Sequence, residues 1–498
     1  MKVNLMFRNK DFDVEAKSYL DKEALTSDLG LERILSTMAQ GDEIIYEVCN
    51  TTLFCPLQSI GEIHYRQENL RDALQNPDTV RQLYEITVET EKRVKKSWYW
   101  LSSIYLTSIF SNAVGLLKIY IEMLRELRAV ADSKLSGFQS EGFRNLLTMI
   151  QRELDDDYFI KVQTLLNELK DNDGMLISAK LGNYLQGVDY VLRRKNRKGF
   201  WLRWTFAPSF TVPPRDDAGA VDLEKRRERA INEAANALAQ AAEHLKSFFA
   251  ILRRELAFYV GCLNLADSLR ALHMPICIPN VLPIERQDRL WHKLYDVSLA
   301  LTKNEPVVGN DLETVDKRLY IITGPNQGGK TTFLRSIGQA QLMMQCGMFV
   351  GAESFSAPIR NGVFTHFKKE EDAGMKSGKL DEELSRMNGL VNHLKPGSLM
   401  LFNESFSATN EREGSEICRQ ITRALIDSNV EVFSVTHLYT YASAFLNDPN
   451  TQFLKARRLE NGERTFRIIP GEPMQTAFGV DLYWKIFTDS NRIQLQEV

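Results

Sequence analysis

The segment from Gly324 to Thr331, which reads GPNQGGKT, constrains this chain more than any other feature of its sequence. It fits the pattern G-x-x-x-x-G-K-[ST] without a mismatch. An apolar run, Leu319–Thr323, precedes it, and a segment with helical character follows it to about Gln345. Glycines in such a loop let backbone N–H groups turn inward around phosphate oxygens, and the helix that follows adds partial positive charge. The segment therefore predicts a strand, a phosphate-binding loop and a helix.

Each position of this loop has an expected role in binding ATP and Mg²⁺. We expect Lys330 to reach the β- and γ-phosphates and the hydroxyl of Thr331 to bind Mg²⁺. The alternative is a tight strand–helix turn that only resembles the motif. The nucleotide-binding residues predicted from the loop are Gly324, Pro325, Asn326, Gln327, Gly328, Gly329, Lys330, Thr331 and Thr332.

A second strand of such an ATPase carries the polar side chains that act beside Mg²⁺. The apolar run Ser398–Phe402 ends in Asn403 and Glu404. Asn403 stands where an Asp usually holds the Mg²⁺ shell, and its amide oxygen can accept a hydrogen bond from metal-bound water without adding negative charge. Glu404 is the expected general base for the attacking water. The alternative is an ordinary polar residue at a strand end.

A third run, Val430–Val435, has His437 beyond its tip. A histidine at this place senses the γ-phosphate in ABC-type ATPases, although a lone histidine is more often structural. The predicted catalytic residues are therefore Glu404, His437 and Lys330, and the predicted metal-binding residues are Thr331 and Asn403.

Three observations bear on where the chain works. Its six cysteines form no C-x-x-C pair, which favours a reducing, cytoplasmic compartment and no cysteine metal site. The N-terminal residues MKVNLMFRNKDF contain no apolar core of a signal peptide. The stretch Trp98–Leu117 carries no formal charge and is long enough to span a bilayer, but Ser, Thr and Asn side chains interrupt it. We expect a buried core helix there, with a membrane span as the alternative.

The loop, the Asn-Glu pair and the histidine together resemble the MutS family of ATPases. The resemblance is carried by TGPNQGGKTTFLRSIGQAQLMMQCGMFVGAE, SLMLFNESFSATNEREG and VTHL, and it covers about Pro275 to Ala477. The helical sequence FYVGCLNLADSLRAL upstream fits more weakly. The resemblance implies that the ATPase domains dimerise, that a signature segment of the other subunit covers each nucleotide, and that long lever helices carry the change of state to a DNA clamp.

The chain departs from this family at four places, one of which is Ser405–Thr409, where a glycine-rich turn usually follows the second carboxylate. Asn403 replaces the usual Asp, and the signature segment is matched by Met375–Leu384, in which Ser377 is the expected contact to the nucleotide of the partner subunit. No counterpart of the N-terminal mismatch-reading domain is found in the first fifty residues. The resemblance therefore implies a role in DNA repair or recombination other than classical mismatch reading.

The region where the resemblance places a clamp is basic and aromatic. Cations there can neutralise phosphates, and rings can stack on bases. The alternative is a solvated helix end and a hairpin whose rings pack on the lever. The predicted nucleic-acid contacts are Arg193, Arg194, Lys195, Arg197, Lys198, Trp201 and Trp204.

The pattern of the whole chain predicts a multidomain α and α/β protein. A stripe of apolar residues at helical spacing runs from Ile231 to Leu263, which predicts one long helix starting after Asp222. From about Asn310, short strands alternate with amphipathic segments, which predicts a largely parallel sheet. The predicted parts are an N-terminal helical core segment at 1–78, lever helices at 79–275 with a clamp-like insertion near 190–220, and an ABC-type P-loop ATPase domain at 276–498.

These observations favour a Mg²⁺-dependent ATPase that acts as a homodimeric, ATP-gated switch and binds DNA. The balance of 62 Lys and Arg against 65 Asp and Glu excludes a wholly basic nucleic-acid coat. Two alternatives remain open: a nucleotide-gated scaffold that binds protein or RNA, and a nucleotide binder with little hydrolysis.

Overall fold

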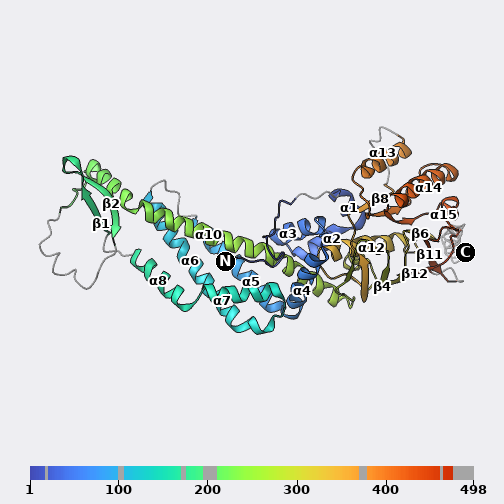
Figure 1. The fold of residues 1–498 in the computed structure, drawn as a ribbon, viewed down its shortest axis with the longest axis horizontal. Coiled ribbons are helices and arrows are strands. Elements are labelled where there is room, and N and C mark those ends of the chain that lie inside the picture. Colours follow the sequence, from blue (N-terminus) through green and yellow to red (C-terminus); the bar gives the residue numbers. More distant parts are fainter. Residues whose placement is uncertain are drawn as a thin grey trace, which may run out of the picture. The chain divides into compact units, whose positions relative to one another are not determined.

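The computed structural model describes residues 1–16, 21–98, 106–169, 175–193, 210–369, 378–459 and 464–474 (Figure 1). The chain packs into two compact units. The helical unit consists of Met1–Leu5 and Asn76–Leu256, and the sheet unit consists of Met6–Gln75 and Ala257–Val498. The predicted mixed helical and α/β fold is confirmed. The predicted domain boundaries at residues 78 and 275 stay predictions, because they divide the chain in sequence order whereas each compact unit combines two separate segments.

The helical unit contains long helices and one β-hairpin. Its elements are α5 (Pro77–Trp98), α6 (Leu106–Lys134), the 3₁₀ turn η1 (Leu135–Gly137), α7 (Glu141–Glu153), α8 (Asp156–Leu169), β1 (Leu176–Leu181), the 3₁₀ turn η2 (Asn183–Leu185), β2 (Gly187–Arg193) and most of α10 (Asp217–Ala271). Helix α10 has 55 residues and confirms the long helix predicted from the apolar stripe, although it begins before the expected start after Asp222. Within the helical unit, the stripe packs against α6, where the rings of Tyr120 and Phe249 stack with centroids 5.6 Å apart.

The described residues 106–117 of the uncharged stretch form the start of α6. Phe110, Val114 and Leu117 are buried, as expected for a core helix, and residues 99–105 lie outside the described part of the chain. No helix in the described ranges is both long and apolar enough to cross a membrane.

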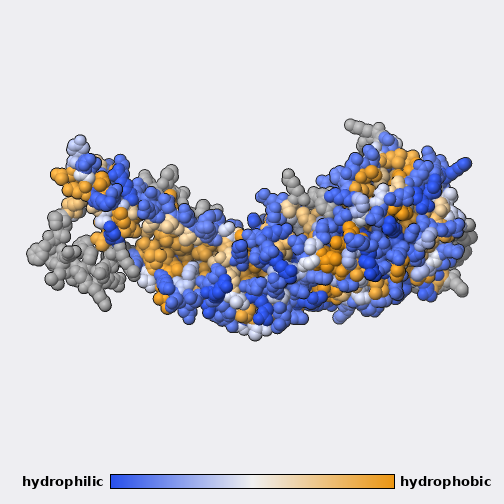
Figure 2. Space-filling view, viewed as in Figure 1, coloured by the Kyte–Doolittle hydropathy of each residue, from blue (hydrophilic) through white to orange (hydrophobic). Residues whose placement is uncertain are grey.

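The hairpin of β1 and β2 was not predicted from the sequence. Its strands pair antiparallel, and η2 joins them with Tyr184 and Leu185 at positive φ, 67° and 62°. Tyr184 is 97% exposed and Leu185 is 79% exposed. Figure 2 shows hydrophobic side chains on the surface of this hairpin, as it does at other places on the molecule.

The sheet unit begins with four helices, α1 (Lys22–Leu29), α2 (Leu31–Ala39), α3 (Glu43–Phe54) and α4 (Ile60–Gln75). Asp21 and Asp42 cap α1 and α3, because each carboxylate accepts hydrogen bonds from N–H groups of the first turn. In this unit the helices pack against the C-terminal part of the chain. For example, the side-chain amide of Gln67 donates to the carbonyl oxygen of Pro279 at 3.1 Å.

A six-stranded sheet forms the centre of the sheet unit, in the order β12-β11-β6-β10-β9-β8. All neighbours are parallel except the edge pair of β11 and β12. The strands are β6 (Leu319–Thr323), β8 (Val363–Phe367), β9 (Leu399–Asn403), β10 (Glu431–Val435), β11 (Thr451–Arg458) and β12 (Arg464–Pro470). Three of them confirm the apolar runs predicted as strands, and their burial explains why those runs are apolar.

Helices and a second sheet accompany the central sheet. The helices are α11 (Val297–Lys303), α12 (Lys330–Gln345), α13 (Lys379–Val391), α14 (Glu411–Asp427) and α15 (Tyr439–Ser443). The second sheet has the order β3-β7-β4-β5, with β3 (Asn280–Leu282), β4 (Arg289–Leu294), β5 (Asn310–Thr314) and β7 (Ser354–Pro358).

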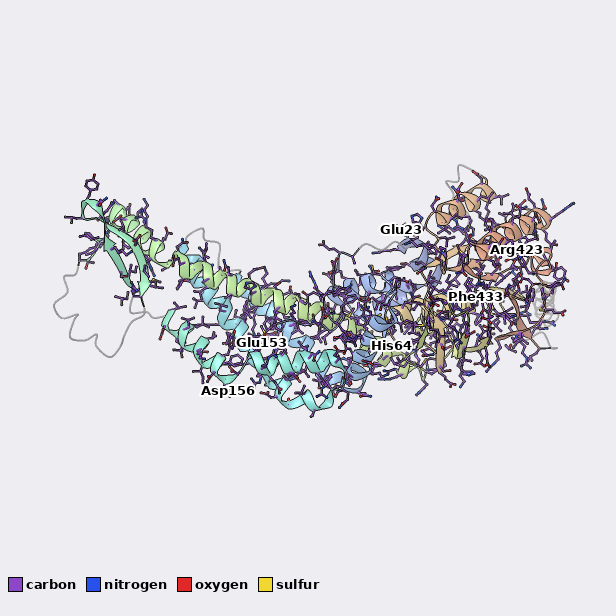
Figure 3. All side chains as sticks on the ribbon, viewed as in Figure 1. Glu23, His64, Glu153, Asp156, Arg423 and Phe433 are labelled. Atoms are coloured by element: carbon purple, nitrogen blue, oxygen red, sulfur yellow. The ribbon has the colours of Figure 1, made fainter. Side chains whose placement is uncertain are left out.

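The core of the sheet unit combines aromatic packing with a buried charge cluster. Phe433 of β10, labelled in Figure 3, stacks on Tyr320 of β6 with ring centroids 3.9 Å apart. Glu431, at the start of β10, accepts hydrogen bonds from Arg289 and Arg360 at 2.6 to 2.7 Å. All three charged side chains are at most 1% exposed, so each charge depends on its partners in place of water.

Candidate functional site

The loop between β6 and α12 has the backbone shape that the glycine pattern predicts. Gly324 has φ 120° and Gly329 has φ 88°, both in the region that favours glycine. A Cβ on Gly324 would lie 3.0 Å from the backbone nitrogen of Ala456, so a side chain would force the loop away from β11. Helix α12 starts at Lys330, so its first N–H groups lie at the end of the loop. The sequence thus forms a strand, a tight loop and a helix, as expected.

Lys330 lies folded back on the loop. Its ammonium donates to the carbonyl oxygens of Gly324 and Pro325, both at 2.9 Å. Burial lowers the pKa of Lys330 to about 8, the charge of Glu404 acts in the opposite direction, and the charge of Arg464 lowers it further. The ammonium is therefore held by two neutral carbonyl groups, which a charged acceptor such as a phosphate can replace.

Thr331 and Asn403 meet although 72 positions separate them. The hydroxyl of Thr331 donates to Oδ1 of Asn403 at 3.0 Å. Asn403 ends β9, and Thr331 lies in the first turn of α12. Hydroxyl and amide oxygens are among the hard ligands that Mg²⁺ binds, usually together with water and phosphate oxygens. The pair therefore fits a Mg²⁺ site, with one carboxylate fewer than an Asp would supply.

Glu404 and His437 form the second contact of the site. Nε2 of His437 lies 2.8 Å from Oε1 of Glu404, and both side chains are about 30% exposed. The hydrogen bond from His437 lowers the pKa of Glu404, with burial opposing it and the charge of Lys330 assisting. Glu404 has φ 53°, which is uncommon for a residue other than glycine. An ionised, partly exposed carboxylate held in this way can accept a proton from water.

The strand order brings these side chains together. Strands β6, β10 and β9 are parallel neighbours, so their carboxyl ends meet at one edge of the sheet. The loop, the Asn403–Glu404 pair and His437 each follow one of these strands. A crevice outside the carboxyl ends of parallel strands is the usual position of a ligand site in an open α/β sheet.

Several predicted residues lie outside the described part of the chain. Ser377 falls just before α13, in the gap at 370–377, and the remaining basic and aromatic residues of the proposed DNA patch fall in the gap at 194–209. Arg193 ends β2, where its Nε donates to the hydroxyl of Ser178 at 2.9 Å. The roles of Ser377, Arg193 and the other residues of the proposed DNA patch stay predictions.

The structure adds neighbours that the motifs did not reveal. The charge of Arg464 on β12 acts on Lys330, and His366 on β8 contacts Ser405, the residue after Glu404. Neither has a sequence signal, because a lone Arg or His outside a recognised motif marks no site in a single sequence. Asn310, at the start of β5, accepts from the backbone N–H of Ile468 and so ties β12 to the second sheet.

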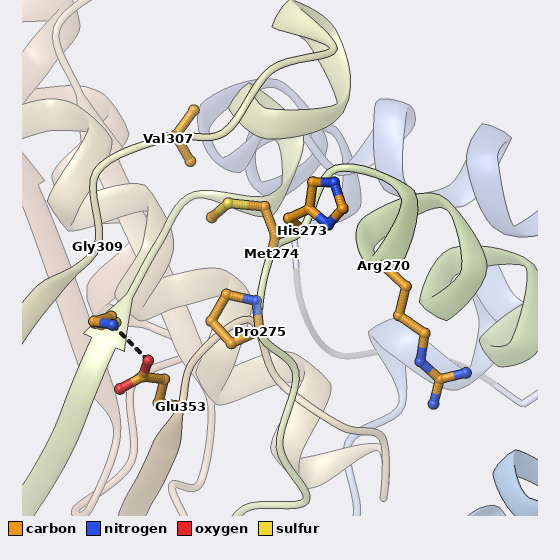
Figure 4. Close-up of a pocket in the computed structure, with 8 residues that line it drawn as sticks. Arg270, His273, Met274, Pro275, Val307, Gly309 and Glu353 are labelled. Atoms are coloured by element: carbon orange, nitrogen blue, oxygen red, sulfur yellow. Dashed lines mark hydrogen bonds and ion pairs between the residues drawn. The ribbon is translucent and has the colours of Figure 1, made fainter.

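A separate hollow of about 440 Å³ lies beside β4 (Figure 4). Lys293 and Glu353 form an ion pair of 2.6 Å on its wall, and Arg270 and His273 also line it. None of its described lining residues belongs to the predicted site. The hollow therefore adds nothing to the chemistry at the strand ends.

Comparisons with known proteins identify the family that two parts of this chain match. The model of the MutS2 N-terminal domain matches residues 58–272, and the model of MutS domain V matches residues 320–482. The chain is similar to human MutS protein homolog 4, with 27% identity over 198 residues, which are 37% of this chain and 21% of that protein.

Two bacterial proteins are similar over a comparable share of the chain. Endonuclease MutS2 of Lacticaseibacillus casei is 30% identical over 187 residues, 36% of this chain and 23% of that protein. DNA mismatch repair protein MutS of Thermotoga neapolitana is 33% identical over 179 residues, 35% of this chain and 22% of that protein. The matched part of the chain thus spans about a fifth of the length of these relatives.

Proposed function

Because this chain belongs to the MutS family, we propose that it is a Mg²⁺-dependent ATPase that works as a dimeric, ATP-gated switch on DNA. One observation carries the proposal: Lys330, Thr331 and Asn403 lie at the same sheet edge as Glu404 and His437. DNA repair or recombination is the proposed setting, and a cytoplasmic location is part of the same proposal.

The loop and Lys330 bind the phosphates of ATP. Backbone N–H groups of the loop and the start of α12 provide donors for phosphate oxygens. Lys330 exchanges its two carbonyl partners for phosphate oxygens, which are stronger acceptors because they are charged. Binding therefore stabilises the protonated form of a lysine that is easily deprotonated in the free protein.

Thr331 and Asn403 hold Mg²⁺. When bound, the metal ion neutralises part of the negative charge on the phosphate oxygens. Thr331 would offer its hydroxyl oxygen to the ion, and the amide oxygen of Asn403 would accept a hydrogen bond from water beside it.

Glu404 takes the proton from the attacking water. Its depressed pKa keeps the carboxylate ionised at neutral pH. His437 engages Oε1, so Oε2 is the atom that we expect to receive the proton. In the same proposal, His437 also senses the γ-phosphate.

The proposals of dimer formation and DNA binding are based on membership of the MutS family. We propose that the ATPase domains of two subunits pair around ATP, with Ser377 of each subunit at the nucleotide of its partner. The basic residues from Arg193 onward are the proposed DNA contact. The mass in solution, measured with ATP held by the Glu404→Gln variant, tests pairing, and a strict monomer with bound ATP at micromolar concentration contradicts it.

The test of the enzymatic function is steady-state phosphate release. Glu404→Gln keeps the shape of the side chain and removes the base, so turnover should fall at least ~100-fold while ATP still binds. Glu416→Gln on α14 is the matched control, because Glu416 is exposed and pairs only locally with Arg419 and Gln420. Full turnover in Glu404→Gln contradicts the assignment.

A second function, nucleotide binding with little hydrolysis, is favoured by Asn403 alone. An amide brings no negative charge to the metal site, which weakens the support for Mg²⁺. If the unchanged protein binds ATP but releases phosphate no faster than Glu404→Gln, this second function replaces the first.

A further inference from the structure

The turn that carries Glu404 needs support from its surroundings. This turn, residues 404–408, follows β9, and both Glu404 and Phe406 adopt left-handed backbone angles, with φ 53° and 58°. Residues other than glycine hold such angles only where neighbouring groups fix them, and such positions cluster at functional sites. The groups that fix this turn therefore bear on the direction of the Glu404 carboxylate.

His366 of β8 contacts the two residues that follow Glu404. Its Nδ1 lies 2.8 Å from Oγ of Ser405, and the Ser405 hydroxyl donates to the carbonyl oxygen of His366 at 2.6 Å. The ring of Phe406 stacks on the imidazole at 5.1 Å and 18°. His366 is 1% exposed, so these contacts are shielded from water.

The other side of the imidazole is held by α13. Nε2 lies 3.0 Å from the carbonyl oxygen of Glu383 and 3.2 Å from Nη2 of Arg386. Arg386 also donates to the carbonyl oxygen of Phe367 at 2.8 Å, which fixes α13 to β8. Burial lowers the pKa of His366 to about 4, with the charge of Arg386 acting in the same direction. The imidazole is therefore a neutral, fixed link between α13 and the turn.

We propose that His366 is a positioning residue for Glu404. Through Ser405 it fixes the backbone directly after the general base, and through Phe406 it fixes the second left-handed residue of the turn. The inference rests on the proposed function, because it concerns the direction of the base in ATP hydrolysis. A histidine that only filled space in the core would not need a nitrogen facing Ser405.

Two substitutions separate the two ring nitrogens. The amide of His366→Asn reaches the place of Nδ1, whereas the amide of His366→Gln reaches the place of Nε2. A misplacement of about 1 Å in a catalytic group can cost ~100-fold in rate. We expect His366→Gln to lower kcat about 10- to 100-fold and His366→Asn to stay within about threefold of the unchanged protein, with the dissociation constant for ATP within about threefold in both.

Ser405→Ala supplies a smaller change at the same contact. It should lower kcat to the same extent as His366→Gln, and the double variant should show no further loss, because both remove one interaction. The matched control is His393→Gln, just beyond the end of α13, since His393 is exposed and its Nδ1 contacts the carbonyl oxygen of Gly389 four positions earlier. This control should keep the kcat of the unchanged protein.

The result that overturns the inference is a wild-type kcat in both His366→Gln and Ser405→Ala. Equal losses in His366→Asn and His366→Gln that follow the loss of thermal stability also overturn it, since they indicate packing alone. Glu404→Gln, measured alongside, distinguishes this failure from a failure of the proposed function. If that variant loses turnover while the His366 variants keep it, only the positioning role is wrong.

Discussion

Substitution of Glu431 by Gln tests how much the buried charge cluster stabilises the sheet unit. The change keeps the size of the side chain and removes the charge that two buried arginines share. Arg289 donates to both carboxylate oxygens at 2.6 Å and Arg360 donates at 2.7 Å, with all three side chains at most 1% exposed. Breaking a buried pair by removing one partner costs about 3–5 kcal/mol, because the remaining charge stays out of water.

Hydrogen exchange measured by mass spectrometry on peptides from β9 and β10 reports this loss directly. Since each 1.4 kcal/mol is a factor of ten, exchange in the slowest amides should accelerate by about 100- to 4,000-fold. Glu416→Gln, which removes an exposed carboxylate, is the control and should leave these peptides almost unchanged. Replacing the three residues together by Met or Leu should cost much less than Glu431→Gln, because no charge remains unpaired.

The same cluster has a defined pH dependence. Burial alone would raise the pKa of Glu431, but attraction to Arg289 and Arg360 outweighs burial and lowers it. A lowered pKa in the folded state contributes stability above the unfolded value of about 4.3, and that contribution is lost as the pH falls through the folded value.

At neutral pH, an acceleration of amide hydrogen exchange of less than about tenfold in Glu431→Gln refutes the reasoning about the buried charge cluster.

Three further predictions concern the site and the proposed DNA contact. ATP affinity should weaken above pH 8, by at most about tenfold per pH unit, because the pKa of Lys330 is about 8 and phosphate binding requires its ammonium form. A dissociation constant for ATP that does not change between about pH 7 and pH 9.5 contradicts this prediction. Asn403→Asp should keep or raise turnover, since it restores a charge beside Thr331; collapse of Mg²⁺-dependent nucleotide binding is the contrary result. Replacing five basic residues by Gln should reduce the slope of log DNA affinity against log salt concentration by up to about 4 units, while ATP turnover persists. Unchanged DNA affinity would show that these residues do not contact DNA and would favour the scaffold alternative. Those positions are Arg193, Arg194, Lys195, Arg197 and Lys198.

The parts of the site that the sequence predicted are those defined by local pattern. The glycines, Lys330 and Thr331 stand at fixed spacing, and the structure gives them the expected strand, loop and helix. Glu404 and His437 were found because each follows an apolar run that forms a buried strand. Their mutual contact depends on β10 lying beside β9, and no spacing in one sequence specifies that pairing.

The features that the sequence missed depend on contacts between distant segments. Gln67 bonds to the carbonyl of Pro279 across 212 positions, which joins the early helices to the C-terminal part of the chain within the sheet unit. His366 lies 39 positions from Ser405 and has no motif around it. The hairpin turn at Tyr184 and Leu185 uses positive φ at residues with little preference for it, so turn chemistry gives no signal there.

The identity of the nucleotide recovered from the protein after incubation with ATP and Mg²⁺ tests the central claim most directly. The protein is separated rapidly from free nucleotide, denatured, and its bound nucleotide is identified by chromatography. We predict ADP on the unchanged protein, intact ATP on Glu404→Gln and little nucleotide on Lys330→Ala. Recovery of ADP from Glu404→Gln at the level of the unchanged protein would contradict hydrolysis by the carboxylate at the end of β9.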